Sequence, residues 1–112
     1  MKYCDDWQHG YGMPGSKSYR VHPKAWEEIE AAADWYLQRS PDASAGFLAA
    51  LFDGLENVSA SPTRWPLYLY GTRRFVMERF PFSIIYLDKP EVVTVVAVAH
   101  SKRKPGYWKR RV

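Results

Sequence analysis

The chain has 112 residues, enough for one domain with a hydrophobic core and too few for two. Hydrophobic residues make up 46% of it, which excludes a disordered tail, and its longest apolar run, within 92–99, is too short to cross a bilayer. The charge is uneven, because residues 24–60 carry two basic and seven acidic side chains, whereas 61–112 carry eleven basic and three acidic ones. This basic half suggests a polyanionic partner, the alternative being charge that only keeps a tail in solution.

The cysteine and histidine patterns argue against several site classes. Cys4 is the only cysteine, so an internal disulfide and a cysteine-based zinc site are excluded. His9, His22 and His100 have no ligand partner at helical spacing, and no phosphate-binding glycine motif follows a strand, so we expect no metal and no other cofactor. The first residues lack the apolar stretch of a signal peptide, so we expect a cytoplasmic protein.

The N-terminal part of the chain differs from the rest. Residues 1–17 are rich in glycine and tyrosine and show no periodicity, so we expect a loosely ordered extension, with Met13 as an alternative start to Met1. A single domain is then expected over 18–112. Its first element is a short strand over 18–22, where apolar and polar residues alternate.

Two helices are predicted after this strand. Pro23 suits the first position of a helix, and apolar residues then recur at three- and four-residue spacing from Trp26 to Leu37. Ser40 provides the cap and Pro41 the first turn of a second helix. Because the connection is so short, the two helices should pack as an antiparallel hairpin.

Some side chains on these helices have both a structural and a functional interpretation. Trp26 and Trp35 lie at helical spacing, which favours the core over a binding surface. Glu27, Glu28 and Glu30 occupy the early turns, where the helix dipole favours acids. We predict that they form a solvated face and take no part in catalysis.

The second half changes to strand periodicity. The segment 73–80 places Phe75 and Met77 on one face, 82–87 is rich in isoleucine and aromatic residues, and a four-residue turn leads into 92–99. The last segment is apolar on both faces, which predicts a central strand buried on two sides. The order of elements predicts an α+β fold: an N-terminal strand, a two-helix antiparallel hairpin and a three-stranded antiparallel meander, with the helices packed on one face of the sheet.

A cluster of basic and aromatic residues directly follows the predicted central strand. Its members are His100, Lys102, Arg103, Lys104, Tyr107, Trp108, Lys109, Arg110 and Arg111. Lysine and arginine can neutralise phosphates, tyrosine and tryptophan can stack on bases, and Arg73, Arg74 and Arg79 could extend the patch. His100 could shuttle a proton, the alternative being a histidine that caps a backbone carbonyl or packs on Tyr107. Trp108 either binds a partner or anchors the C-terminal segment.

Five short motifs, in the right order, resemble the RelE/ParE toxins over about residues 18–111. They are Tyr19-Arg20-Val21 with Pro23, Ala31-Ala32-Ala33-Asp34-Trp35-Tyr36 with Ser40-Pro41, Arg73-Arg74-Phe75, Arg79-Phe80-Pro81-Phe82 with Ile84-Ile85-Tyr86, and Val96-Ala97-Val98-Ala99-His100 with Arg103-Lys104-Pro105-Gly106-Tyr107-Trp108. The resemblance implies a small sheet with two N-terminal helices, which agrees with the fold predicted above. It also implies the toxin component of a type II toxin–antitoxin system, which inhibits bacterial growth.

The resemblance implies partners as well. A cognate antitoxin, typically acidic and partly disordered when free, would fold over the toxin in a hetero-oligomer and cover the basic patch and the apolar groove near the helix hairpin. One branch of the family poisons DNA gyrase and is not known as an enzyme. The other cuts messenger RNA inside the ribosome without a metal, so that the 2′-hydroxyl attacks the adjacent phosphate.

The ribonuclease branch is matched only in part. Its basic residue on the second strand matches Arg74, and its C-terminal tyrosine matches Tyr107. Its basic residue after the last strand matches Lys102 or Arg103, but its arginine on the third strand falls at Ser83. Losing one donor that stabilises charge on the reacting group commonly costs about 10²–10³ in rate.

Three functions therefore follow from the sequence. The favoured one is a toxin that acts on DNA gyrase or in another non-cleaving mode. The alternative is a ribosome-dependent endoribonuclease in which Arg74, Lys102 and Arg103 hold the phosphate and Tyr107 or His100 transfers a proton. The third is a non-toxic module that binds nucleic acid. Target or nucleic-acid contacts are then expected from Arg73, Arg79, Lys104, Trp108, Lys109, Arg110 and Arg111.

Overall fold

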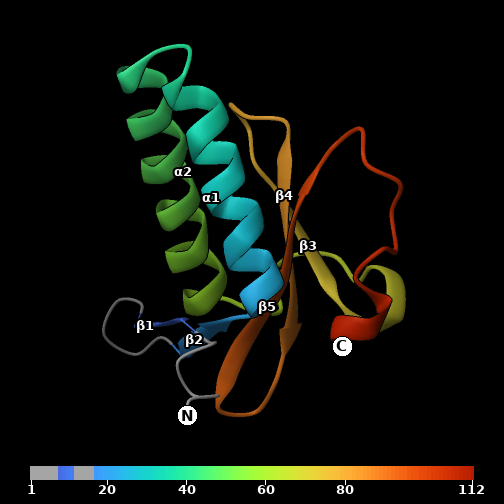
Figure 1. The fold of residues 1–112 in the computed structure, drawn as a ribbon. Helices are drawn as coiled ribbons and strands as arrows, with labels where there is room; N and C mark the ends of the chain where they lie inside the picture. The colour runs from blue at the N-terminus through green and yellow to red at the C-terminus, as the bar shows by residue number, and fades with distance from the viewer. Residues whose placement is uncertain (1–7, 12–16) are drawn as a thin grey trace, which may run out of the picture.

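The computed structural model describes residues 8–11 and 17–112, in which two helices cover one face of a sheet and the C-terminal segment covers the other (Figure 1). Its elements are β1 (Gln8–Tyr11), β2 (Ser18–Val21), α1 (Pro23–Leu37), α2 (Pro41–Ala60), the 3₁₀ turn η2 (Leu69–Gly71), β3 (Arg73–Val76), β4 (Phe82–Asp88), β5 (Val92–His100) and the 3₁₀ turn η3 (Lys109–Arg111). The predicted α+β fold is confirmed. No helix in the described ranges has the length and apolar character needed to cross a membrane.

The sheet has the strand order β1-β2-β5-β4-β3. The meander of β3, β4 and β5 is antiparallel, as predicted, and β2 lies parallel to β5, with Ser18 opposite Val92 and Val21 opposite Val95. Strand β1, inside the expected N-terminal extension, pairs antiparallel with β2 and was not predicted. The rest of that extension, including both candidate start residues, lies outside the described residues.

The predicted helix boundaries are confirmed by their caps. Pro23 occupies the first turn of α1, and the His22 side chain accepts a hydrogen bond from the Lys24 backbone N–H. Ser40 caps α2 through the Ala43 backbone N–H at 3.3 Å. Local sequence signals therefore set where both helices begin.

The main core lies between the helices and the sheet. Buried residues of both helices, such as Ile29 and Leu51, meet Ile84 of β4 and Val95 of β5. A second apolar layer lies on the other face of the sheet. It is formed by Ile85, Val96, Ala97, Ala99 and Trp108. The prediction that β5 is buried on both faces is therefore confirmed.

Two expectations about individual elements need correction. Trp35 was predicted in the core but is 52% exposed, because it projects from the edge of the apolar stripe of α1, whereas Trp26 packs against the core. The strand predicted over 73–80 ends at Val76. The Met77 N–H already bonds the Phe82 carbonyl at 3.0 Å, which closes the turn between β3 and β4.

Candidate functional site

The C-terminal segment, residues 101–112, is fixed to the sheet by Trp108. This side chain is only 1% exposed, and its ring centroid lies 5.7 Å from that of Tyr68 and 5.2 Å from that of Tyr107. A tryptophan buried in this way cannot stack on a base without the segment lifting off. The structure therefore favours the anchoring alternative for Trp108, and the predicted cations around it are carried on a fixed support.

The predicted solvated role of Glu28 is wrong. Strand β2 ends at Val21, opposite Val95, so the following residues of β5 have no partner strand along that edge. The Glu28 carboxylate accepts a hydrogen bond from the otherwise unpaired Val98 N–H at 2.9 Å. Its side chain is 14% exposed, whereas Glu27 is largely exposed, as predicted. Glu28 therefore completes the edge of the sheet.

The same carboxylate holds two arginines of the C-terminal segment. Arg103 and Arg111 each place a guanidinium nitrogen 3.1 Å from a Glu28 oxygen. Arg111 also donates to the Val96 carbonyl at 3.1 Å. Two of the predicted binding cations are thus tied to a single acid and to the backbone of β5.

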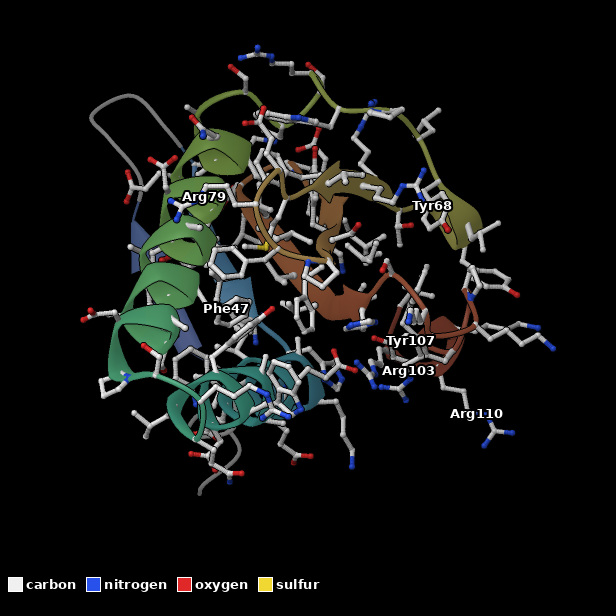
Figure 2. The ribbon with its side chains drawn as sticks, turned by 90° about the horizontal axis from the view of Figure 1, so that it is seen from above. Phe47, Tyr68, Arg79, Arg103, Tyr107 and Arg110 are labelled. Carbon is white, nitrogen blue, oxygen red and sulfur yellow. The ribbon has the colours of Figure 1, made fainter. Side chains whose placement is uncertain are left out.

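Tyr107 lies between these two arginines. The guanidinium carbon of Arg103 is 3.5 Å from the centre of the Tyr107 ring, and that of Arg111 is 5.0 Å away (Figure 2). Burial raises the pKa of the Tyr107 hydroxyl above its usual value of 10, and the nearby Glu28 carboxylate adds to the shift, which the two arginines only partly oppose. A hydroxyl held protonated in this way releases its proton less readily than a free tyrosine.

A small cavity of about 70 Å³ brings together several residues that the resemblance had aligned. Arg74, Ser83, His100 and Arg103 all line it, although they come from β3, β4, the end of β5 and the C-terminal segment. The guanidinium of Arg74 lies 4.2 Å from the centre of the Tyr68 ring. Ser83 brings no charge to the cavity, so only two arginines serve it directly.

His100 has a structural role at the end of β5. Its Nδ1 accepts a hydrogen bond from the Lys102 N–H at 3.0 Å, and its ring stands edge-on to Phe82 with centroids 5.0 Å apart. The anticipated structural role is therefore present with different partners, because His100 binds a backbone N–H and not a carbonyl, and packs on Phe82 and not on Tyr107. Its other ring nitrogen is not used by these contacts.

The remaining predicted cations do not form one patch. Arg73 donates to the carbonyls of Trp65 at 2.6 Å and Thr63 at 3.3 Å, so it clamps the loop after α2. Arg79 lies in the turn after β3, beside α2 and well apart from Arg103 (Figure 2). On the C-terminal segment, Lys102, Lys104, Lys109 and Arg110 are exposed, as is the ion-paired Arg103.

An apolar groove of about 400 Å³ separates α1 from the end of the sheet. Trp35 and Tyr36 of α1 line one side, Phe82 and Val98 line the other, and Arg103 stands at its margin. The exposure of Trp35 is explained by this groove. Sequence analysis missed the part that Glu28 and Tyr68 play here, since neither carries a local signal for it. Within the described residues, no three histidine, cysteine or acidic side chains gather as metal ligands do.

The chain was compared with known families and structures. A family model described as the ParE toxin of the type II toxin–antitoxin system, parDE, matches residues 19–105. Among solved structures, the chromosomal ParDE TA system from P. aeruginosa superposes with a TM-score of 0.65 at 17% identity, covering 73% of this chain and 92% of that one. No curated protein matches. Because the family match runs from β2 into the C-terminal segment, this chain belongs to the ParE toxin family of type II toxin–antitoxin systems.

Proposed function

We propose that this protein is the growth-inhibiting toxin of a toxin–antitoxin pair and that it acts without cutting RNA, with DNA gyrase as its target. Membership of the ParE toxin family supports the toxin role. One observation carries the non-cleaving mode: the groups that would perform cleavage are already engaged within the molecule. Glu28 and Tyr107 occupy Arg103, and Tyr68 lies against Arg74.

The chemistry of RNA cleavage explains why this matters. Without a metal, the reaction needs a base for the 2′-hydroxyl, an acid for the leaving oxygen, and cations for the charge that develops on the phosphate. The raised pKa of Tyr107 makes this hydroxyl a poor acid at neutral pH. The Glu28 carboxylate beside it is already bound to two arginines and is therefore a weak base. Ser83 adds no positive charge. These features favour a docking surface over an active site.

A second candidate function is supported by the cavity of about 70 Å³, because Arg74, His100 and Arg103 converge there. A ribonuclease would place the scissile phosphate at this point and use His100 for proton transfer. Substrate would then have to compete with Glu28 for Arg103. This competition would lower the affinity for the phosphate, so we rank the ribonuclease second.

We further propose that a cognate antitoxin neutralises the protein by covering the apolar groove beside α1. The groove exposes Trp35 to solvent beside the partly buried Tyr36, and its walls are mostly apolar. Arg103, which also lines the groove, would favour an acidic segment. A partly disordered antitoxin segment would become ordered as it buries these side chains.

The proposed function is tested by controlled expression in bacteria that lack the antitoxin. Thymidine and amino-acid incorporation are followed separately over the first minutes, and purified protein is added to a gyrase supercoiling reaction. We expect DNA synthesis to fail first and supercoiling to be inhibited. An early collapse of protein synthesis with cut transcripts would contradict the proposal. In that case Arg103→Ala/Tyr107→Ala should abolish cleavage, whereas antitoxin binding should be largely retained because the apolar walls of the groove are unchanged.

A further inference from the structure

A corner patch of the molecule shares no residue with the apolar groove. It consists of Leu67, Leu69 and Tyr70 from the loop before β3, and Lys109 and Arg110 from η3. The three apolar side chains are 70%, 40% and 47% exposed, respectively. The Lys109 ammonium lies 5.5 Å from the centre of the Tyr70 ring, and η2 and the C-terminus lie side by side (Figure 1). The patch therefore joins two segments that are distant in sequence.

One residue of the patch, Tyr70, is held in an unfavourable backbone conformation. Tyr70 has a φ of 61°, and it is the one non-glycine residue in the described ranges with a positive φ. Thr72 fixes the tip from below, since it is fully buried and its hydroxyl donates to the Leu69 carbonyl at 2.6 Å. Gly106, with a φ of 92°, leaves room for the Tyr70 ring, because a Cβ there would come within 3.2 Å of it. The fold thus supports a strained tip that holds apolar side chains in solvent, which points to a partner and not to stability.

The surrounding charge specifies the partner. The two chain segments that contribute to this corner, 61–77 and 92–112, contain nine lysines and arginines and no acidic residue, and only Arg103 and Arg111 of the nine are paired with Glu28. Lys109 and Arg110 are exposed, and Figure 2 shows the Arg110 side chain extending away from the body of the protein. An acidic surface would complement this charge. The aliphatic side chains of Leu67 and Leu69 suit an apolar recess on a protein, whereas a nucleic acid would favour aromatic and cationic contacts.

We infer that the corner patch docks onto an acidic protein surface, that of the toxin's target. This inference rests on the proposed function, since it presumes a protein target such as gyrase. A few apolar side chains with a cationic rim form a small interface, as is typical of a transient complex. The apolar groove beside α1, where Trp35 is exposed, is larger and would bury more apolar surface. It is therefore the better site for a long-lived antitoxin complex.

The test separates the apolar contacts from the charges. One variant, Leu67→Ser/Tyr70→Gly, removes exposed side chains and leaves a backbone that glycine adopts easily. A second, Lys109→Glu/Arg110→Glu, reverses the charge. The matched control, Leu37→Ser/Lys89→Glu, makes the same kinds of change at exposed residues of other elements. Binding to purified gyrase, growth inhibition and co-purification with the antitoxin are measured for all three.

We expect each corner variant to bind gyrase at least about tenfold more weakly, as the loss of an interface anchor does. Both should bind the antitoxin normally, and the control should behave like the wild type. Loss with the charge variant alone would overturn the inference in favour of a polyanion. Equal loss of antitoxin binding would make the patch an antitoxin surface instead. If the wild type does not bind gyrase and stops translation, the proposed function fails. The inference then stands only if the Leu67→Ser/Tyr70→Gly variant weakens ribosome binding without changing its salt dependence.

Discussion

Replacing Glu28 by glutamine should destabilise the protein far more than its position among surface acids suggests. Glu28 and Arg111 both have side chains that are 14% exposed, so their ion pair is largely buried. Removing one partner of a buried pair leaves the other charge uncompensated, which costs about 3–5 kcal/mol. Glutamine keeps the volume and an oxygen for the Val98 N–H, so we take the lower end, about 3 kcal/mol. The pair with Arg103, which is half exposed, adds less than about 1 kcal/mol.

Urea denaturation of the purified protein, followed by tryptophan fluorescence, measures this free energy of unfolding. For a domain of this size, about 3 kcal/mol corresponds to a melting temperature lower by about 12 °C. Glu28→Ala should lose about 1 kcal/mol more, because the Val98 N–H then has no acceptor. Glu27→Gln is the matched control, since the Glu27 carboxylate is exposed and its ion pair with Lys24 is long, at 3.9 Å. A Glu28→Gln variant within about 0.5 kcal/mol of that control would refute the reasoning.

Two further predictions concern stability. Gly46→Ala should raise the free energy of unfolding by up to about 1 kcal/mol, because alanine favours a helix and the new Cβ would meet its nearest neighbour at an ordinary 3.8 Å. Gly54→Ala should lower the free energy of unfolding by about 1–3 kcal/mol, because its Cβ would lie 3.0 Å from Ile84 and Phe75. Equal effects in chemical denaturation would show that α2 does not approach the sheet this closely. Burial raises the pKa of Tyr86 to about 12, so the unfolded chain loses this proton first, near pH 10. The contribution of Tyr86 to stability should therefore be constant below pH 10 and be lost as the pH rises toward 12. Tyr86→Phe should reduce this alkaline loss in pH-dependent melting curves, and an unchanged profile would assign the loss to other groups.

The fold was predictable where the signals are local. Pro23 and Ser40 mark the helix starts in the sequence itself, and the doubly apolar β5 could be recognised because both of its faces are covered. Strand β1 was not predicted because its sequence does not alternate between apolar and polar residues. Only its pairing with β2 identifies it as a strand. The prediction for Trp35 was wrong because helical spacing shows which side of a helix a residue lies on. It does not show how far the neighbouring helix and sheet extend over that side.

The candidate site was predictable in its residue types and only partly in its geometry. The family resemblance predicted that Arg74 and Arg103 belong to one site, and both residues line the same cavity. It did not reveal that Glu28 holds Arg103 and Arg111, because that depends on where β2 stops and where the C-terminal segment returns. Contacts between residues about 75 positions apart leave no periodic pattern along the chain.

The parallel pairing of β2 with β5 has a consequence for folding during translation. Ser18–Val21 can complete its place in the sheet only after Val92–Val95 has been synthesised, so β2, made early, waits for β5, the last strand of the sheet to be made. Such non-local pairing slows folding, and a chain grows from its N-terminus at about 5–20 residues per second. Arg111 and Trp108, which fix the C-terminal segment, follow β5 in the chain and are made later still. The surfaces built on this segment therefore do not exist on the nascent chain until residues 92–111 have been synthesised.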